Sequence, residues 1–226
     1  HRHGPQSAGH GHGQTGQVPD RRVEPGIGDL VATPPVLGSR DAQRGAAAAA
    51  ELAGVLGAAA APLSGTDNER AGAEPVVVLS VPFDGLDDNL DAIAVTASEA
   101  IIVSMVNPLG FDRRGPYPVS VPEGSVAEHV AGRFPHARVV SALNTVAAPV
   151  LNDLGTPLDE DVLVAGDDPD AVQTVVDLVD RIEGTRALVV GPLRLSVVLE
   201  SLTPVLIGVN KRYRTHAGIR LSRVTT

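Results

Sequence analysis

The chain alternates short apolar runs, rich in β-branched residues, with segments of helical spacing. The runs VVVLSVP at 76–82 and AIIVSMVNP at 100–108 both contain a proline at or next to their end. Continuous apolar runs of this length are typical of strands that are buried on both faces. Strands that alternate with helices along a chain predict an α/β fold with a mainly parallel sheet.

The same alternation continues toward the carboxyl terminus. Leu86, Leu90 and Ile93 lie at helical spacing, and Pro169 opens another segment with a helical pattern. An Ala-rich segment near the start is strongly helix-forming, with Asp41 or Ser39 as its N-cap. Helices are predicted at 42–56, 84–93, 124–134, 169–182 and 193–213, and strands at 76–82, 100–108, 137–145, 161–168 and 185–192.

Composition excludes several classes of function. Hydrophobic residues make up 43% of the 226 residues and aromatic residues only 2%, which predicts an aliphatic core. Cysteine is absent, so disulfide scaffolds, thiolate enzymes and cysteine-ligated zinc sites are excluded. The net charge of −9 and the scarcity of aromatic residues argue against nucleic acid as a partner. No stretch matches the ~20 strongly apolar residues of a membrane span, so we expect no membrane partner, and a cytoplasmic protein.

Residues 1–30 differ from the rest of the chain. They are rich in Gly, Pro, His and Gln and lack apolar periodicity, which predicts a disordered or aberrant N-terminal segment. Four histidines lie there, but nothing else in the segment supports a metal site, and no metal is expected.

The last 26 residues carry five basic side chains and no acidic one. A local excess of this kind is found at anion-binding sites. It is also found at helix C-termini, where cations complement the helix dipole. Both interpretations remain open for Lys211, Arg212, Arg214, Arg220 and Arg223.

A polar turn follows the apolar residues 36–37. In dinucleotide-binding α/β proteins, the residue that ends the second strand meets the adenosine ribose, and an Arg nearby accommodates the 2′-phosphate of NADP. Here Ser39 and Arg40 occupy such a turn, and Arg44 lies one helical turn beyond Arg40. A hydroxyl and two guanidinium groups suit a dianion. A serine cap followed by surface arginines is the alternative interpretation.

Several blocks together resemble the NADPH-dependent coenzyme F-420 reductases, most closely those of actinobacteria. They are GSRDAQR, VVVLSVPF, VNPLGFDRRGPY, GSVAEHVAGRFP, VVSALNTV, DVLVAGDD and VLESLTPVLIGVNKRYRTHAGIR. The resemblance extends from about Leu37 to Val224. It implies an NADP-binding Rossmann domain at 31–148 and a small C-terminal domain at 149–226 that completes a deazaflavin cleft. It also implies direct hydride transfer between NADP(H) and coenzyme F-420 without a metal.

The resemblance assigns roles by position. The 2′-phosphate would contact Ser39, Arg40 and Arg44. The dinucleotide would lie along Thr15, Ser80, Val81 and Pro82. The deazaflavin would be bordered by Asn107, Pro108 and Leu109. The nicotinamide would be held between Asn144 and Ala148, although the family often has His where this chain has Asn144.

The N-terminal part departs from the family, which opens with an apolar strand and a Gly-Gly-Thr-Gly-x-x-Gly loop. This chain offers only Gly13-Gln14-Thr15-Gly16, and Pro34 and Pro35 cannot occupy a central strand. Two explanations stay open, a reading-frame or start-site error and a divergent protein that has lost the loop.

Three functions follow from these features. The first is hydride transfer between NADPH and coenzyme F-420. The alternatives are an anion-binding α/β protein that is impaired or inactive through loss of the glycine-rich loop, and another NADP-dependent reductase. The apolar terminal helix could bury one face against a second subunit, which would make the protein a homo-oligomer.

Overall fold

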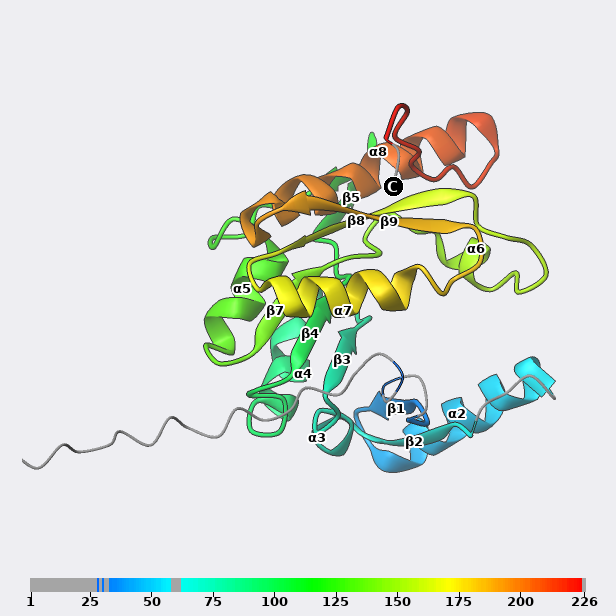
Figure 1. Cartoon of the computed structure of the whole chain (residues 1–226). Helices are drawn as coiled ribbons and strands as arrows, with labels where there is room; N and C mark the ends of the chain where they lie inside the picture. Colours follow the sequence, from blue (N-terminus) through cyan, green and yellow to red (C-terminus); the bar gives the residue numbers. More distant parts are fainter. Residues whose placement is uncertain (1–27, 29, 31–32, 58–61, 225–226) are drawn as a thin grey trace, which may run out of the picture.

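The computed structural model describes residues 28, 30, 33–57 and 62–224 (Figure 1). The described strands form three sheets, a five-stranded central sheet and two small sheets of two strands each. The predicted N-terminal segment 1–30 falls almost wholly outside the described residues. The elements are β1 (Val36–Ser39), α2 (Ala42–Leu56), β2 (Ser64–Asp67), α3 (Asn68–Ala71), β3 (Val76–Leu79), α4 (Leu86–Ile93), β4 (Ile101–Ser104), β5 (Leu109–Asp112), β6 (Gly115–Pro118), α5 (Val126–Arg133), β7 (Arg138–Ser141), α6 (Ala148–Leu151), β8 (Glu160–Gly166), α7 (Pro169–Val179), β9 (Thr185–Gly191), the 3-10 turn η2 (Leu193–Leu195) and α8 (Ser196–Tyr213).

The central sheet has the order β3-β4-β7-β8-β9. Strands β3, β4 and β7 are parallel to one another, and β8 and β9 are parallel to each other. Strand β8 runs antiparallel to β7, pairing through Val140 with Gly166 and Ser141 with Ala165. The predicted α/β fold with a mainly parallel sheet of Rossmann type is therefore confirmed.

Two apolar clusters cover the two faces of this sheet. Ile102 of β4 packs with residues of α4 and α5, including Leu90 and Val130. Its neighbours in sequence, Ile101 and Val103, pack on the opposite face with residues of α7. All four residues of β4 are buried, as expected for a central strand covered by helices on both sides.

Strands β1 and β2 form a separate parallel pair beside β3. Helix α2 begins after Asp41, whose carboxylate accepts a hydrogen bond of 2.8 Å from the backbone N–H of Arg44. Gly45 on α2 lies against the backbone of Thr66 on β2, so a side chain at Gly45 would collide with β2. This close approach holds α2 on the two-stranded sheet.

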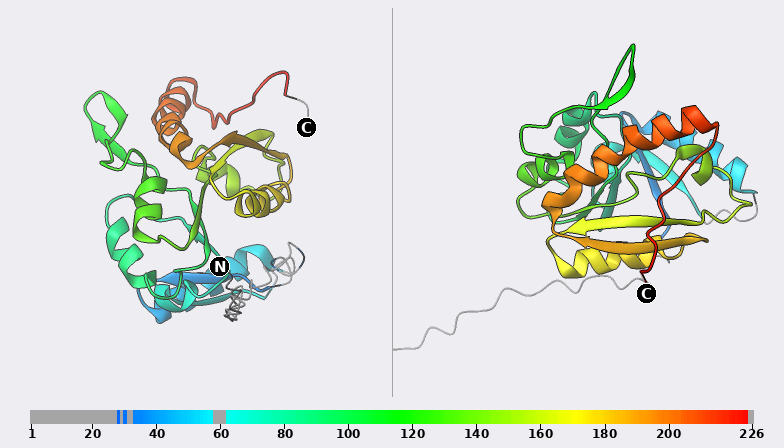
Figure 2. Two further views of the ribbon diagram at one scale, coloured as in Figure 1. Left: turned by 60° about the vertical axis from the view of Figure 1, so that its left-hand side comes forward. Right: turned by 90° about the horizontal axis from the view of Figure 1, so that it is seen from above.

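Several short elements were not predicted from the sequence, namely β2, α3, α6 and the two strands of the β5–β6 hairpin. The sequence of β2 is polar, α3 spans four residues, and the hairpin contains Gly and Pro where a strand pattern was not evident. Its turn is closed by Asp112, whose carboxylate accepts hydrogen bonds from the N–H groups of Arg114 and Gly115. The hairpin projects from the body of the molecule (Figure 2).

Helix α8 crosses one side of the molecule as its long terminal element (Figures 1 and 2). Residues Leu193–Tyr213 are long and apolar enough, by length and composition alone, to cross a membrane, and 28% of their most apolar 18-residue stretch is buried. The sequence prediction that no stretch reaches this length was therefore too strict. The helix nevertheless contains Pro204 and the buried Glu200, and it packs against α5.

Candidate functional site

A pocket of about 450 Å³, hereafter the α8 pocket, lies between the carboxyl end of the central sheet and α8. One wall comes from the loops after β4 and β7, through Asn107 and the segment 144–149. The other wall comes from α8, through Thr203, Leu206 and Ile207. Ligands of open α/β sheets bind beyond the carboxyl ends of the strands, and this pocket lies at that edge of the sheet.

Hydrogen bonds from three elements fix the loop after β7. The carbonyl oxygen of Asn144 accepts a bond of 2.8 Å from the side-chain amide of Asn107 and another of 2.8 Å from the hydroxyl of Thr203. The side-chain oxygen of Asn144 accepts a bond of 3.0 Å from the hydroxyl of Ser141. Leu143 has a positive φ of 63°, a strained conformation for a bulky residue that the surrounding bonds maintain.

One polar atom of this pocket has no partner among the described residues. The side-chain oxygen of Asn107 is buried and accepts no hydrogen bond there, although its amide nitrogen is engaged by Asn144. A buried acceptor without a donor costs free energy.

Helix α8 is anchored by a buried carboxylate. The two oxygens of Glu200 accept hydrogen bonds of 2.9 and 3.1 Å from the backbone N–H groups of Val126 and Ala127, at the first turn of α5. Burial raises the pKa of Glu200 to about 7, against the opposing effect of these two bonds. The anchor lies one helical turn before Thr203 and so fixes the α8 wall of the pocket.

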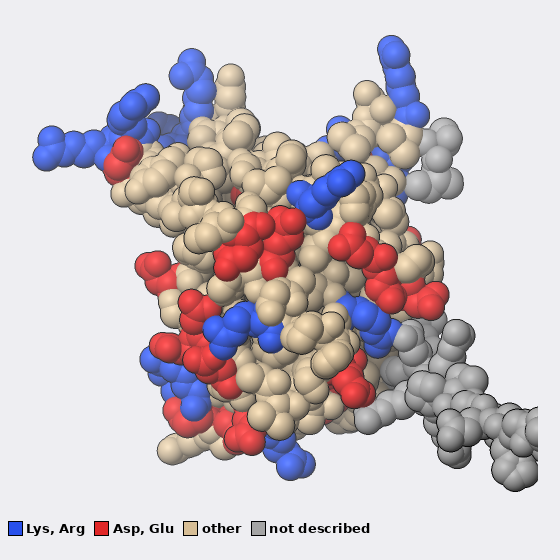
Figure 3. Space-filling model, turned by 90° about the vertical axis from the view of Figure 1, so that its left-hand side faces the viewer, with Lys and Arg blue, Asp and Glu red and all other residues tan. Residues whose placement is uncertain are grey.

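The basic C-terminal residues divide into two groups. Lys211 lines the pocket together with His216, and the guanidinium of Arg212 lies 6.0 Å from the ring of Tyr213. Arg220 instead pairs with Asp159 and Asp161. Figure 3 shows basic side chains at the upper corners of one face, above acidic side chains across its middle.

The buried Asp161 ties the C-terminal segment to β8. Its carboxylate binds the guanidinium of Arg186 through two hydrogen bonds of 2.9 and 2.8 Å, and it also accepts the N–H of Leu221. The Arg186 bonds dominate in lowering the pKa of Asp161 to about 2. Arg220 therefore has a structural role through these ion pairs, which is neither an anion site nor the complement of a helix C-terminus.

The structure brings some of the predicted site residues together and separates others. Asn107, Asn144 and Ala148 line the α8 pocket. Ser80 and Val81 line a different cavity, of about 780 Å³, between β1 and β3. Ser39 ends β1, Arg40 and Arg44 are exposed beside it, Pro82 is exposed, Pro108 is buried and Leu109 begins β5. Thr15 lies outside the described residues.

Several residues of the pocket were not assigned roles from the sequence, among them Thr203, Leu206 and His216, whereas Lys211 belongs to the basic stretch for which anion binding was one interpretation. Thr203 contacts a carbonyl 59 residues away in the chain, and no local pattern announces such a contact. Among the described residues, no group of three or more His, Asp or Glu side chains forms a metal site.

The chain is similar to curated proteins named F420-dependent NADP reductase. It is 35% identical over 196 residues to that of Methanocaldococcus jannaschii, covering 84% of this chain and 87% of the relative. It is 32% identical over 195 residues to that of Methanothermobacter thermautotrophicus, covering 84% of each. No protein-family model matches the chain.

Solved structures give the same picture. A protein from Arthrobacter sp. FB24, whose description gives F420-dependent NADP reductase as its candidate function, superposes with a TM-score of 0.71. It is 25% identical, over 83% of this chain and 88% of that one. A hypothetical protein from Sinorhizobium meliloti, 24% identical over 76% of this chain and 77% of that one, shares the fold with a TM-score of 0.56.

Proposed function

The chain belongs to the F420-dependent NADP reductase family, and from that premise we propose which of its residues bind the two substrates. The protein is an oxidoreductase that transfers a hydride between NADPH and coenzyme F-420. This function is favoured over an impaired anion-binding protein and over a reductase of another substrate. NADP(H) and coenzyme F-420 are accordingly its small-molecule partners.

The α8 pocket is proposed as the site where the two reacting rings meet. The observation that carries this assignment is that Asn107, the segment 144–149 and α8 line one pocket beyond the carboxyl ends of β4 and β7, with aliphatic side chains beside polar ones. Pockets of small-molecule cofactors combine apolar walls with a few placed polar groups in this way.

Asn107, which lines this pocket, and its neighbours Pro108 and Leu109 are proposed to border the deazaflavin. Asn144 and Ala148 are proposed to hold the nicotinamide side. Ser39, Arg40 and Arg44 are proposed to bind the 2′-phosphate, and Thr15, Ser80, Val81 and Pro82 to contact the rest of the dinucleotide. The position of Ser80 and Val81 directly after β3, and of Ser39 at the end of β1, supports this placement.

For direct hydride transfer, the protein has to hold the nicotinamide and deazaflavin rings in the right relative position. NADPH supplies a hydride at nicotinamide C4, and coenzyme F-420 takes it up at deazaflavin C5. The residues that fix Asn144 hold one wall of the pocket, and Thr203 joins that wall to α8. Leu206 and Ile207 exclude water from the ring faces. Orientation of this kind accounts for a large share of rate enhancement in hydride transfer.

Domain division, compartment and partners remain proposals. We propose the division into 31–148 and 149–226, supported by the change of strand direction between β7 and β8. A cytoplasmic protein without nucleic acid or membrane partners is supported by the net charge of −9 and by the packing of α8 on α5. Exposed apolar side chains on α8, among them Val198 and Val205, support a homo-oligomer.

Replacement of Asn107 tests the pocket assignment. Asn107→Ala removes a side chain that lines the pocket and the bond that it donates to the carbonyl of Asn144, so we expect kcat/KM for coenzyme F-420 to fall by about ten- to a hundredfold. Asn152→Ala, at an exposed position after α6, is the control and leaves the kinetics unchanged. Unaltered kinetics in Asn107→Ala, with an unchanged fold, would place the reacting rings elsewhere.

A further inference from the structure

Helix α8 makes few apolar contacts with the rest of the fold, although it forms one wall of the α8 pocket. Four of its 18 residues are buried, namely Ser196, Leu199, Glu200 and Pro204. Only two of these, Leu199 and Pro204, are apolar. Apolar packing therefore contributes little to where α8 lies, and the polar contacts of the helix have to fix its position.

The middle of α8 lacks one of its own backbone hydrogen bonds. Proline has no N–H, so Pro204 cannot donate to the carbonyl of Glu200, four residues earlier in the helix. Prolines inside helices are frequent sites of bending. The turn formed by residues 200–204, hereafter the proline turn, is therefore the point at which the two halves of α8 are joined least firmly.

Two side-chain contacts connect the proline turn to the rest of the protein. The carboxylate of Glu200 accepts the N–H groups of Val126 and Ala127 at 2.9 and 3.1 Å. The hydroxyl of Thr203 donates to the carbonyl of Asn144 at 2.8 Å. The first contact joins the turn to α5, and the second joins it to the loop that forms the opposite wall of the pocket.

The first turn of α5 depends on Glu200 for two of its backbone donors. Ser125 is the N-cap of α5, and its hydroxyl accepts only the N–H of Glu128. The N–H groups of the first two helical residues have no acceptor within a helix, and here both are bound by Glu200. A carboxylate can accept both, whereas the amide of glutamine would turn an NH2 group toward one of the two donors.

We propose that Glu200 is a positioning residue for hydride transfer, because its carboxylate holds the proline turn in the place where Thr203 contacts the loop after β7. Glu200 does not itself line the α8 pocket, so it acts through Thr203 and Asn144. Burial of a charge is costly, and an aliphatic side chain often replaces one without loss of stability. The inference rests on the proposed function, in which the two reacting rings meet in this pocket.

The charged groups around Glu200 determine the pH range in which the carboxylate is ionised. The elements that pack against α8 carry Glu128, His129 and Arg133 on α5 and Arg194 on η2, whereas β6 carries none. Burial, with a smaller contribution from the charge of Glu128, raises the pKa of Glu200 to about 7, against the effect of the two N–H bonds. We therefore expect the rate of hydride transfer to rise with pH across this range, as Glu200 becomes ionised.

Glu200→Gln tests the proposal through two quantities that a purely structural role would not separate. At pH 8 the single-turnover rate of hydride transfer from NADPH to coenzyme F-420 should fall about tenfold, because the α8 wall is displaced. The KM values should change less than about twofold, since both rings still bind. The melting temperature should stay the same or rise, because the variant no longer buries a charge. The rise of the rate across pH 7 should disappear.

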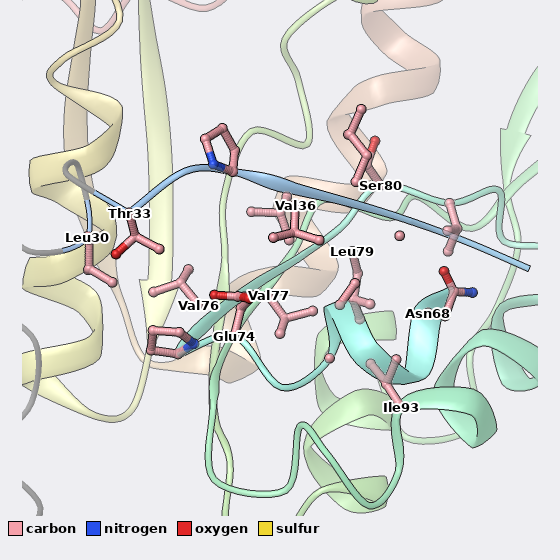
Figure 4. A pocket seen from close by; sticks show the side chains of 18 of the residues that line it. Leu30, Thr33, Val36, Asn68, Glu74, Val76, Val77, Leu79, Ser80 and Ile93 are labelled. Carbon is pink, nitrogen blue, oxygen red and sulfur yellow. The ribbon is translucent and has the colours of Figure 1, made fainter. Parts of the chain in front are cut away.

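Two further variants serve as controls. Glu74→Gln makes the same chemical change at a half-buried position of the cavity between β1 and β3, which Figure 4 shows, and should leave the rate and the melting temperature unchanged. Glu200→Asp keeps a carboxylate that is one methylene shorter, and it should recover part of the rate and the rise with pH.

Nuclear magnetic resonance of the substrate-free protein follows the position of the loop without any turnover. The side-chain amide of Asn107 donates to the carbonyl of Asn144, so its signal should shift in Glu200→Gln and stay in place in Glu74→Gln. An unshifted Asn107 signal, or a rate loss that is matched by a lower melting temperature, would make Glu200 a structural cap only.

The two proposals fail in different ways. Hydride transfer that is equally fast in the unmodified protein and in Glu200→Gln would overturn the positioning role and leave the proposed function standing. Absence of hydride transfer in the unmodified protein would overturn the proposed function and the positioning role together.

Discussion

The strands in the middle of the central sheet and strand β3 at its edge have similar sequences, but their residues are buried to different extents. Strands β4 and β7 have neighbours on both sides, and nearly all their residues are buried. Strand β3 has the equally apolar sequence VVVL but one paired edge, and only Leu79 is buried. An apolar β-branched run thus predicts a strand, whereas burial depends on whether both neighbours are present.

The largest expected difference lies in core substitutions on the two strands. Ile102→Ala, at a fully buried position of β4, should reduce the free energy of unfolding by about 2–5 kcal/mol. Val78→Ala on β3 should cost less than about 1 kcal/mol, because the side chain is half exposed. Urea denaturation of both variants measures this difference. Equal losses of unfolding free energy would show that Val78 stabilises the fold as much as the fully buried Ile102 does.

The β8–β9 side of the central sheet is stabilised by the buried carboxylate of Asp161. Asp161→Asn should lower the free energy of unfolding by about 3 kcal/mol, because it leaves Arg186 without its carboxylate. Asp159→Asn, which affects an exposed pair with Arg220, should cost no more than about 0.5 kcal/mol. Thermal melting compares the two, and a similar small loss in both would remove Asp161 as the anchor of the C-terminal segment.

The two substrate regions should respond differently to loss of charge near β1. The double variant Arg40→Ala with Arg44→Ala should weaken NADPH binding by about ten- to a hundredfold, because two charge-assisted contacts are lost. NADH and coenzyme F-420 should bind as before. Calorimetric titration of all three ligands measures this, and equal losses for NADPH and NADH would show that these arginines do not contact the 2′-phosphate.

The buried Glu200, which anchors α8 beside the pocket, makes the free energy of unfolding depend on pH. The pKa of Glu200 is raised in the folded protein to about 7 from its usual value of 4.5. Between these values the folded state binds more protons than the unfolded state, so this group makes stability fall as pH rises from about 5 to 7. Glu200→Gln should flatten that fall. An unchanged pH profile in Glu200→Gln would assign the dependence to Glu160 and His129, whose pKa values are also raised.

The smallest expected effect concerns the basic C-terminus. Arg212→Glu with Arg214→Glu should slow association of the polyanionic coenzyme F-420 a few-fold and weaken its salt dependence. The melting temperature should hardly change. Arg181→Glu, exposed after α7, is the matched control. A lower melting temperature with unchanged association kinetics would make these residues structural, as Arg220 already is.

The sequence predicted the buried helices and strands well because their signals are local. Helix α2 was predicted with its observed ends, since an Ala-rich segment follows a capping Asp41. The antiparallel direction of β8 was not predicted, because it depends on the path of the chain between β7 and β8. The polar strand β2 was missed because its place is set by packing against Gly45 rather than by apolar periodicity.

The candidate site was predictable only in part. The resemblance to the reductase family identified Asn107 and Asn144, which the structure places in one pocket. The contribution of α8 was not predictable, since Thr203 and Glu200 act through contacts with segments 59 and 74 residues away. The roles of these two residues depend on how α8 packs against α5 and the loop after β7, and no sequence pattern within the helix predicts that packing.

Deuterium transfer tests the central claim most directly. The protein is mixed with NADPH deuterated at nicotinamide C4 and with oxidised coenzyme F-420, and the reduced coenzyme is analysed by mass spectrometry and NMR. A direct hydride transfer predicts loss of the deazaflavin absorbance and one deuterium at C5. Reduced coenzyme F-420 that carries no deuterium, or binding of both substrates without any reduction, would contradict it.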